Sequence, residues 1–132
     1  MKLKLSEIRN ISERLELIEE KRMPVAIGYV ISKNKKILSS EREAIAESAG
    51  KIISKYCKKD ESGTPVLNGD YYTFDDEKQA KLANDEITEL YNTEIEVPIQ
   101  TISLDVLKKC DETGYDALSL KDMEALMFMI LE

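Results

Sequence analysis

Lysines gather in one part of the chain, and they are the side chains best suited to hold an anionic ligand. Lys33, Lys35 and Lys36 stand close together, and Lys55 follows within the same proline-free stretch. Ammonium groups bind phosphates, so these lysines are candidate anion-binding residues for nucleic acid or a nucleotide signal. The net charge of −7 and the scarcity of neighbouring aromatic residues argue against nucleic acid as the partner. A solvated helix face, or a face that pairs with acids of the same chain, is the simpler interpretation.

Acidic residues and cysteines are the remaining candidates for metal or redox chemistry. Asp60-Glu-Ser-Gly63 does not continue into the alternating oxygen ligands and closing glutamate of a calcium loop. Cys57 and Cys110 match no metal-binding or redox spacing, and no apolar run of signal-peptide length follows Met1–Leu5. We therefore expect two reduced thiols, helix caps and solvated loop acids, with no metal and no cofactor.

The chain contains no histidine. Ser-His-Asp triads, Cys-His pairs and His-ligated zinc are therefore excluded as catalytic machinery. The glycine-rich phosphate loop, the dinucleotide-binding fingerprint and the nucleophile elbow are also missing from the sequence. These absences predict that the protein is not an enzyme.

The C-terminal segment is the strongest candidate for a protein interface. A helix that is apolar all round is either central to the core of its own chain or shared with another chain, and both readings stay open here. Methionines adapt to irregular surfaces, which favours a protein partner or self-association as a homodimer or larger assembly. The apolar stretch is too short to cross a bilayer, so no membrane partner is expected. The candidate interface residues are Met123, Leu126, Met127, Phe128 and Ile130.

A long helix from Val25 to about Cys57 must carry the lysines, because no proline interrupts this stretch. At about 1.5 Å per residue such a helix is about 50 Å long. A compact chain of this length has a radius of gyration of about 14 Å. We therefore expect an elongated molecule, or a helix that bends at Ser39-Ser40 or Gly50. Ser6 is expected to cap an earlier helix that runs to about Lys21.

The other elements follow from capping residues and from alternation of apolar side chains. Asn68-Gly69 is a hairpin signal, and Pro98 restricts its strand to a sheet edge. The expected elements are a strand Leu3–Leu5 paired with Ile95–Ile99, a Val66–Tyr72 hairpin, a helix from Asp75 or Asp76 to about Tyr91, a short helix from Ser103 to about Lys109, and a final helix opened by Ser119 with Asp122 that runs to the terminus.

Charge divides the chain into a basic and an acidic part. Residues 1–59 carry 14 basic and 8 acidic groups, and residues 60–96 carry 2 basic and 11 acidic groups. The long basic helix is therefore expected to pack antiparallel to the acidic helix that follows it. The predicted fold is a single α+β domain over residues 1–132, dominated by helices. It comprises a long antiparallel helical hairpin, a small two- or three-stranded sheet and an apolar C-terminal helix.

The order of several short sequence words resembles a family of small proteins encoded by phages and prophages of low-GC Gram-positive bacteria. These words are Met23-Pro-Val-Ala-Ile-Gly-Tyr-Val-Ile-Ser-Lys-Asn-Lys-Lys-Ile-Leu38, Lys55-Tyr-Cys-Lys-Lys-Asp-Glu-Ser-Gly63, Glu89-Leu-Tyr91, Glu94-Ile-Glu-Val97 and Leu118-Ser-Leu120, the last followed by a terminal Met/Leu helix. The resemblance carries over no functional residue, but it implies a viral gene product in the cytoplasm of a bacterial host. The missing catalytic residues and the apolar C-terminal helix together predict a non-enzymatic protein–protein interaction module, which the resemblance places among phage or prophage accessory proteins. The alternative is a phage inhibitor or sponge that captures a host factor, nucleotide signal or nucleic acid through the lysine-rich helix.

Overall fold

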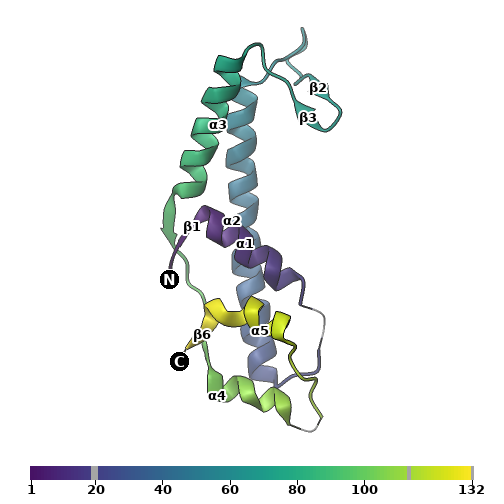
Figure 1. Ribbon diagram of the computed structural model, residues 1–132, viewed down its shortest axis with the longest axis vertical. Coiled ribbons are helices and arrows are strands. Elements are labelled where there is room, and N and C mark those ends of the chain that lie inside the picture. The colour runs from purple at the N-terminus through teal and green to yellow at the C-terminus, as the bar shows by residue number, and fades with distance from the viewer. Residues whose placement is uncertain (19–20, 113, 132) are drawn as a thin grey trace.

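The computed structural model describes residues 1–18, 21–112 and 114–131. The fold is α+β and dominated by helices, and it is elongated along α2 (Val25–Tyr56) (Figure 1). The 32 residues of α2 form one unbroken helix, about 48 Å long at about 1.5 Å per residue. Neither Ser39-Ser40 nor Gly50 interrupts it. The prediction of a long helix is confirmed, and the helix is continuous.

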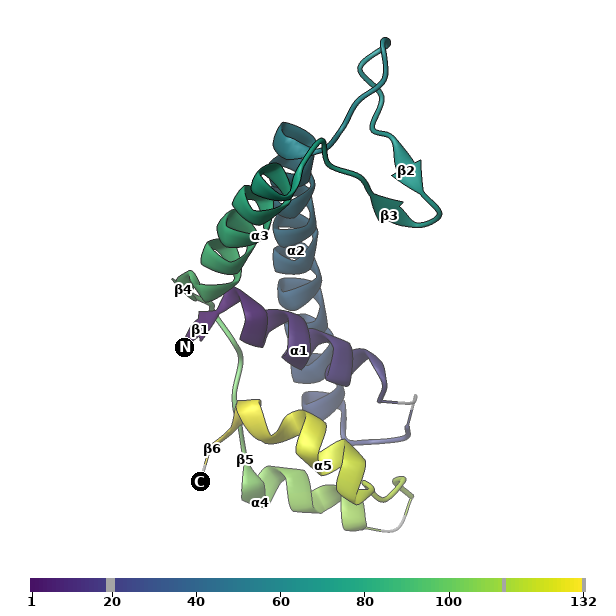
Figure 2. The same ribbon diagram turned by 45° about the horizontal axis from the view of Figure 1, so that its top comes forward.

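Two helices pack against α2 at different heights. α1 (Leu5–Glu16) crosses the lower half of α2, and α3 (Glu77–Asn92) runs antiparallel along the upper half (Figures 1 and 2). The side chain of Asp76 accepts a hydrogen bond of 2.9 Å from the backbone N–H of Gln79, as expected for an N-cap. The predicted helical hairpin is therefore formed by α2 and α3.

The predicted limits of α1 are wrong at both ends. The helix begins at Leu5, and the carboxylate of Glu7 accepts a 3.4 Å hydrogen bond from the backbone N–H of Lys4. Ser6 therefore lies inside the first turn instead of capping it. The C-terminal end is at Glu16, before the expected end at Lys21.

Two of the strand pairs were predicted. β1 (Lys2–Lys4) pairs antiparallel with β4 (Glu94–Glu96), and Leu3 faces Ile95. β4 ends before the expected limit of Ile99, because Pro98 has no backbone N–H to donate to the hydrogen bonds between strands. β2 (Leu67–Asn68) and β3 (Tyr71–Tyr72) form the hairpin, and Gly69 takes a φ of +66° in its two-residue turn. The pairs are separate two-stranded sheets instead of one larger sheet.

The C-terminal helix does not reach the terminus, so that prediction is wrong beyond Leu126. α5 (Leu120–Leu126) is followed by the 3₁₀ turn η2 (Met127–Met129) and by β6 (Ile130–Leu131). β6 pairs in parallel with β5 (Ile102–Ser103). No local sequence pattern predicts this contact. β5 leads into α4 (Leu104–Leu107) and the 3₁₀ turn η1 (Lys108–Asp111), where Ser103 caps the helix as predicted.

The apolar core lies where α1, α5 and the chain after β4 meet the lower half of α2. From α2 it takes Ile27, Ile31, Leu38 and Ile45, which lie on one face. The buried members from the other elements are Leu3, Leu5, Ile8, Leu15, Ile18, Val97, Ile102, Leu107, Cys110, Ala125, Leu126 and Met129.

One polar side chain is fully buried on the same face of α2. Asn34 donates a 2.9 Å hydrogen bond to the carbonyl of Gln100 and accepts one of 2.8 Å from the backbone N–H of Gln100. A buried amide group must be satisfied in this way, because an unpaired one is costly. The pair of bonds holds the segment between β4 and β5 against α2.

Candidate protein-binding surfaces

A β-arm projects from the upper end of the molecule, where α2 ends and α3 begins. We define the arm as residues 58–75, and Figure 2 shows it standing away from the helices. Its base is closed by backbone hydrogen bonds from Lys58 to the carbonyl of Thr73 (2.8 Å) and from Val66 to the carbonyl of Lys58 (2.9 Å). The arm therefore has regular structure although no helix lies behind its tip.

Large apolar side chains at the tip of the arm are open to solvent. The exposed fractions are 79% for Tyr71, 54% for Leu67 and 45% for Tyr72. Leu67 is paired with Tyr72 and therefore shares a face with it, whereas Tyr71 is paired with Asn68 on the opposite face. Both faces of this short hairpin thus present apolar side chains that the described part of the chain leaves exposed.

The outer loop of the arm is ordered by Asp60. Its carboxylate accepts hydrogen bonds from the hydroxyl of Ser62 (2.7 Å) and from the backbone N–H groups of Ser62 (2.9 Å) and Thr64 (3.0 Å). These bonds, the Ser62 hydroxyl first, hold the pKa of Asp60 below its usual value. Gly63 has a φ of +82°, a conformation that favours glycine. The arm is therefore a shaped loop and hairpin.

A second open surface lies between α1 and α5, lower on the molecule. We call it the α1–α5 groove, and its volume is about 300 Å³. Leu17, which follows α1, and Met127, which follows α5, line it with exposed fractions of 64% and 67%. Its other lining residues are Arg14, Ile18, Lys121, Asp122, Glu124 and Ala125.

Asp122 links the groove to the segment that connects α1 with α2. It accepts a 3.0 Å hydrogen bond from the backbone N–H of Ser119 and forms a 3.2 Å ion pair with Lys21. Burial raises the pKa of Asp122, but the bond from Ser119 and the ammonium of Lys21 outweigh burial, and the net pKa lies below the ordinary value. The carboxylate therefore stays charged and joins two distant segments.

The five C-terminal candidates have different surroundings. Leu126 is fully buried in the core of its own chain. Met123, Phe128 and Ile130 are partly buried and pack against that core. Met127 is exposed and lines the α1–α5 groove. Of the five residues, Met127 is therefore the one that the fold leaves open for a partner.

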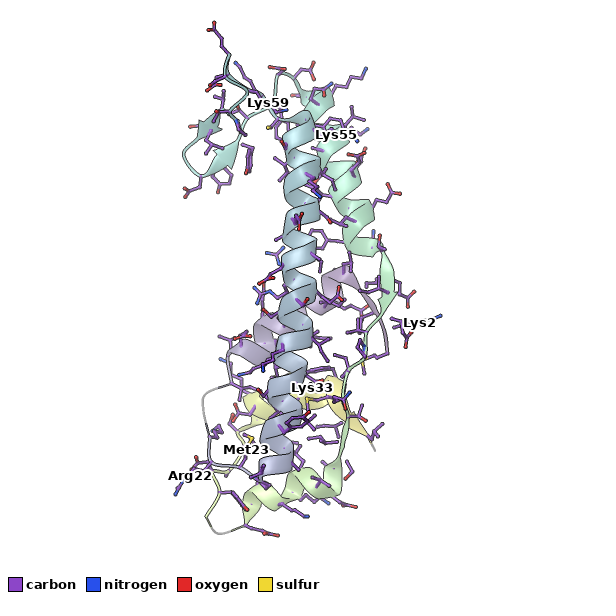
Figure 3. All side chains as sticks on the ribbon, turned by 180° about the vertical axis from the view of Figure 1, so that it is seen from behind. Lys2, Arg22, Met23, Lys33, Lys55 and Lys59 are labelled. Carbon is purple, nitrogen blue, oxygen red and sulfur yellow. The ribbon has the colours of Figure 1, made fainter. Side chains whose placement is uncertain are left out.

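The four candidate anion-binding lysines do not come together. Lys55 forms a 3.0 Å ion pair with Glu86 of α3, and the hydrogen bond that its ammonium donates to the Glu86 carboxylate is the first cause of its raised pKa. Lys33 lies lower on α2, with its ammonium 5.9 Å from the centre of the Tyr29 ring (Figure 3). Twenty-two residues of helix separate the two, which corresponds to about 33 Å.

Lys35 and Lys36 share a shallow recess with two carboxylates, Glu16 and Glu43. The basic character of this surface is therefore reduced by acidic groups of the same chain. With Lys55 engaged at the other end of the helix, the structure does not assemble the lysines into one phosphate site.

A larger recess, of about 450 Å³, opens where α1 crosses between α2 and α3. It contains Arg9 and Arg42 together with Glu13 and Glu43. Arg9 donates hydrogen bonds to Glu13 (3.1 Å) and to the hydroxyl of Tyr91 (3.2 Å). The charges balance within the recess, so it does not select a ligand of either sign.

Comparisons with protein-family models, curated protein sequences and solved structures find no match for this chain. Within the described ranges, no three cysteine or acidic side chains are placed to share a metal ion. In the same part of the chain, no helix has the length and apolarity needed to cross a membrane. Both cysteines are free and buried, and burial raises the pKa of the Cys110 thiol.

Sequence reasoning named Met127 of the α1–α5 groove as a candidate, but it missed Leu17 and the exposed side chains of the arm. The hairpin was predicted, but the exposure of Leu67, Tyr71 and Tyr72 was not. The neighbouring segments contain no apolar pattern against which these side chains could pack. Leu17 lies outside the buried stripe that runs through Ile8 and Leu15 of α1 and continues to Ile18 after the helix. This position outside the stripe could have indicated that Leu17 is exposed.

Proposed function

We propose that this protein is a non-enzymatic protein-interaction module that holds its partner with the β-arm. The observation that carries the proposal is the exposure of Leu67, Tyr71 and Tyr72 on a projecting hairpin with no layer behind its tip. Apolar side chains that are exposed together on one surface can mark a site of protein–protein interaction. Tyrosines are also enriched among the residues that dominate protein interfaces.

The energetics of the hairpin support the same proposal. A two-stranded hairpin is only marginally stable in water without a third strand or a helix against it. Here each strand has two residues, and the apolar side chains of both faces remain exposed. A partner that covers the tip supplies the missing layer and removes this apolar surface from water.

The charge of the arm defines the chemistry of that partner. Two lysines lie at its base, whereas Asp60, Glu61, Asp70 and Asp75 are exposed along it. The complementary surface is an apolar recess bordered by basic side chains. Buried tyrosine rings would supply most of the affinity, and the acidic groups would orient the approach.

The context of this interaction is also a proposal. The resemblance to phage and prophage proteins supports a role as an accessory protein inside a bacterial host. The partner would then be a protein of the cytoplasm, either from the host or from the phage. The paired state of Lys55 gives no support to capture of a nucleotide through the lysine-rich helix.

Site-specific photocrosslinking tests the role of the arm. A photoreactive phenylalanine analogue is placed at Tyr71 in the arm and, as the matched control, at Tyr29 of α2, which is also an exposed tyrosine. In the producing cells, Tyr71 should give one dominant protein adduct and Tyr29 should not. Excess unlabelled protein should abolish the adduct, whereas excess L67D/Y71D protein should leave it.

Two results would overturn the proposal. One is equal crosslinking from Tyr71 and Tyr29, which would mean random collision. The other is competition by the L67D/Y71D variant that matches competition by the unmodified protein. Circular dichroism should give the same helix content for both proteins, because the two substituted positions lie outside the helices and are exposed.

A further inference from the structure

We propose that a second copy of this chain docks on the α1–α5 groove, so that the protein forms a twofold-symmetric dimer. This inference is independent of the arm, which lies at the other end of α2 (Figure 1). Its occupant is defined by the distribution of apolar and charged groups around the groove. A twofold interface brings the same patch of both copies together, so the patch must be complementary to itself.

The apolar part of the patch meets that requirement. Leu17 and Met127 stand on opposite walls of the groove, and each exposes more than three-fifths of its surface. Leu120 precedes Met127 by seven residues, about two helical turns, and extends the apolar surface along α5. Two copies face to face would pack two sets of these side chains into one cluster closed to water. Methionine at the centre adapts to such a contact.

The charged part of the patch is also complementary to itself. Arg14 and Lys121 are basic, and Glu124 is acidic, and all three line the same groove. None of them forms an ion pair with any residue that the structure describes. A twofold axis through the groove would let the glutamate of each copy face a basic side chain of the other. A partner of one uniform charge would instead meet repulsion from one of the two signs.

The rigid surroundings of the groove favour docking without rearrangement. Its floor includes two buried residues, Ile18, which follows α1, and Ala125 of α5. Asp122 is fixed by Ser119 and Lys21, so the start of α5 is held in place before any partner arrives. A preformed surface loses little conformational freedom on association.

Sedimentation velocity of the full chain from about 1 to 200 μM tests the inference. The unmodified protein should shift from monomer to dimer within this range. L17D and M127D should stay monomeric, because each places a carboxylate in the apolar cluster. Y29D is the matched control: it alters an equally exposed side chain on α2, outside the groove, and should dimerise like the unmodified protein.

Charge reversal separates the proposed contact from a general loss of solubility. E124K should weaken dimerisation at least tenfold, since the groove would then present basic side chains to basic side chains. R14E/K121E should weaken it similarly. An equimolar mixture of the two variants should restore association as a heterodimer, because each basic groove would meet an acidic one.

Three outcomes would overturn the inference. The first is a chain that remains monomeric across the whole range. The second is dimerisation of L17D and M127D with unchanged affinity, which would locate the interface elsewhere. The third is failure of the mixed charge variants to associate while each remains folded by circular dichroism. A Y71D variant that dimerises normally keeps this test separate from that of the arm.

Discussion

The lower and upper halves of α2 have different surroundings, although they belong to one continuous helix. The lower half packs against α1, α5 and the segment after β4, and it contributes Ile27, Ile31 and Leu38 to the core, which extends just above the midpoint of the helix to Ile45. The upper half packs against α3 on one side. Between residues 46 and 92, all of which the structure describes, only Cys57 and Ala83 are buried.

If the arm binds a partner as proposed, this difference separates stability from recognition within one small chain. The lower half contains the apolar burial that makes the fold cooperative, and local opening should cost most there. The upper half is a two-helix layer joined across its surface by the Lys55–Glu86 ion pair, and exposed pairs contribute little. The upper half of α2 holds the arm away from the core, so that both faces of the hairpin are accessible to a partner. The following predictions test this division.

Removal of a core side chain from the lower half should have the largest effect. L126A removes a fully buried leucine and should lower the free energy of unfolding by about 2–5 kcal/mol. The matched change in the upper half, L67A in the arm, should cost less than about 0.5 kcal/mol. Urea denaturation monitored by circular dichroism measures both. Equal losses would show that the two halves contribute equally to stability.

Loss of the buried amide of Asn34 should come next. N34A leaves the backbone groups of Gln100 without their partner and should cost about 1–3 kcal/mol. N84A changes an exposed asparagine of α3 and should be nearly neutral. Hydrogen exchange in N34A should rise first in the strand pair β5–β6, which follows Gln100. Unchanged exchange there would contradict the proposed role of Asn34.

The carboxylate of Asp122 should produce a pH-dependent effect in the lower half. Its pKa is lower in the folded chain than the unfolded value of about 3.9, so its contribution is complete above that pH. The contribution is lost as the pH falls through the lower folded value. D122N should therefore cost about 1 kcal/mol at pH 7, and the difference from the unmodified protein should shrink below about pH 4.

Urea titrations at pH 7 and pH 3 measure this change for D122N. The matched control is D85N on the exposed surface of α3, which should alter the free energy of unfolding at pH 7 by less than about 0.5 kcal/mol. A D122N deficit of the same size at both pH values would exclude the carboxylate charge as its cause.

A glycine in the upper half should give the smallest effect, and it should be stabilising. Gly50 is exposed in α2, and an added Cβ would meet no atom within 4 Å. G50A should raise local stability by about 0.5–1 kcal/mol. Hydrogen exchange should slow above residue 46 while the lower half stays unchanged. G63A in the arm is the contrasting variant, because its φ of +82° is unfavourable for alanine.

Much of the fold could be predicted from local signals. The proline-free stretch predicted α2, Asp76 predicted the start of α3, and the alternation at Leu3 and Ile95 predicted β1–β4 pairing. In each case the residues that allow the prediction lie within the element itself, or two segments share the same alternation of apolar and polar residues. The basic and acidic charge blocks also indicated which helices pack together, and Lys55 and Glu86 form the contact.

The surfaces were harder to predict, because exposure depends on what the rest of the chain covers. A run of apolar residues from Leu120 to Leu131 reads as one helix, yet a parallel strand contact with Ile102 ends it. The two strands are far apart in the sequence, so their pairing produces no periodic pattern of apolar residues near either strand. The same limit applies to Leu67 and Tyr71, whose side chains would be core residues if any element lay above them.

The continuity of α2 also fixes the direction in which the arm faces. Each residue of an α-helix advances the chain by about 1.5 Å and rotates it by about 100°. One residue inserted into both α2 and α3 above α1 would therefore turn the arm to a different side of the molecule. Seven inserted residues would lengthen the molecule by about 10 Å and return the arm to within about 20° of its original azimuth. A partner that contacts both ends of the molecule should therefore tolerate the seven-residue insertion better in orientation, and the one-residue insertion better in length.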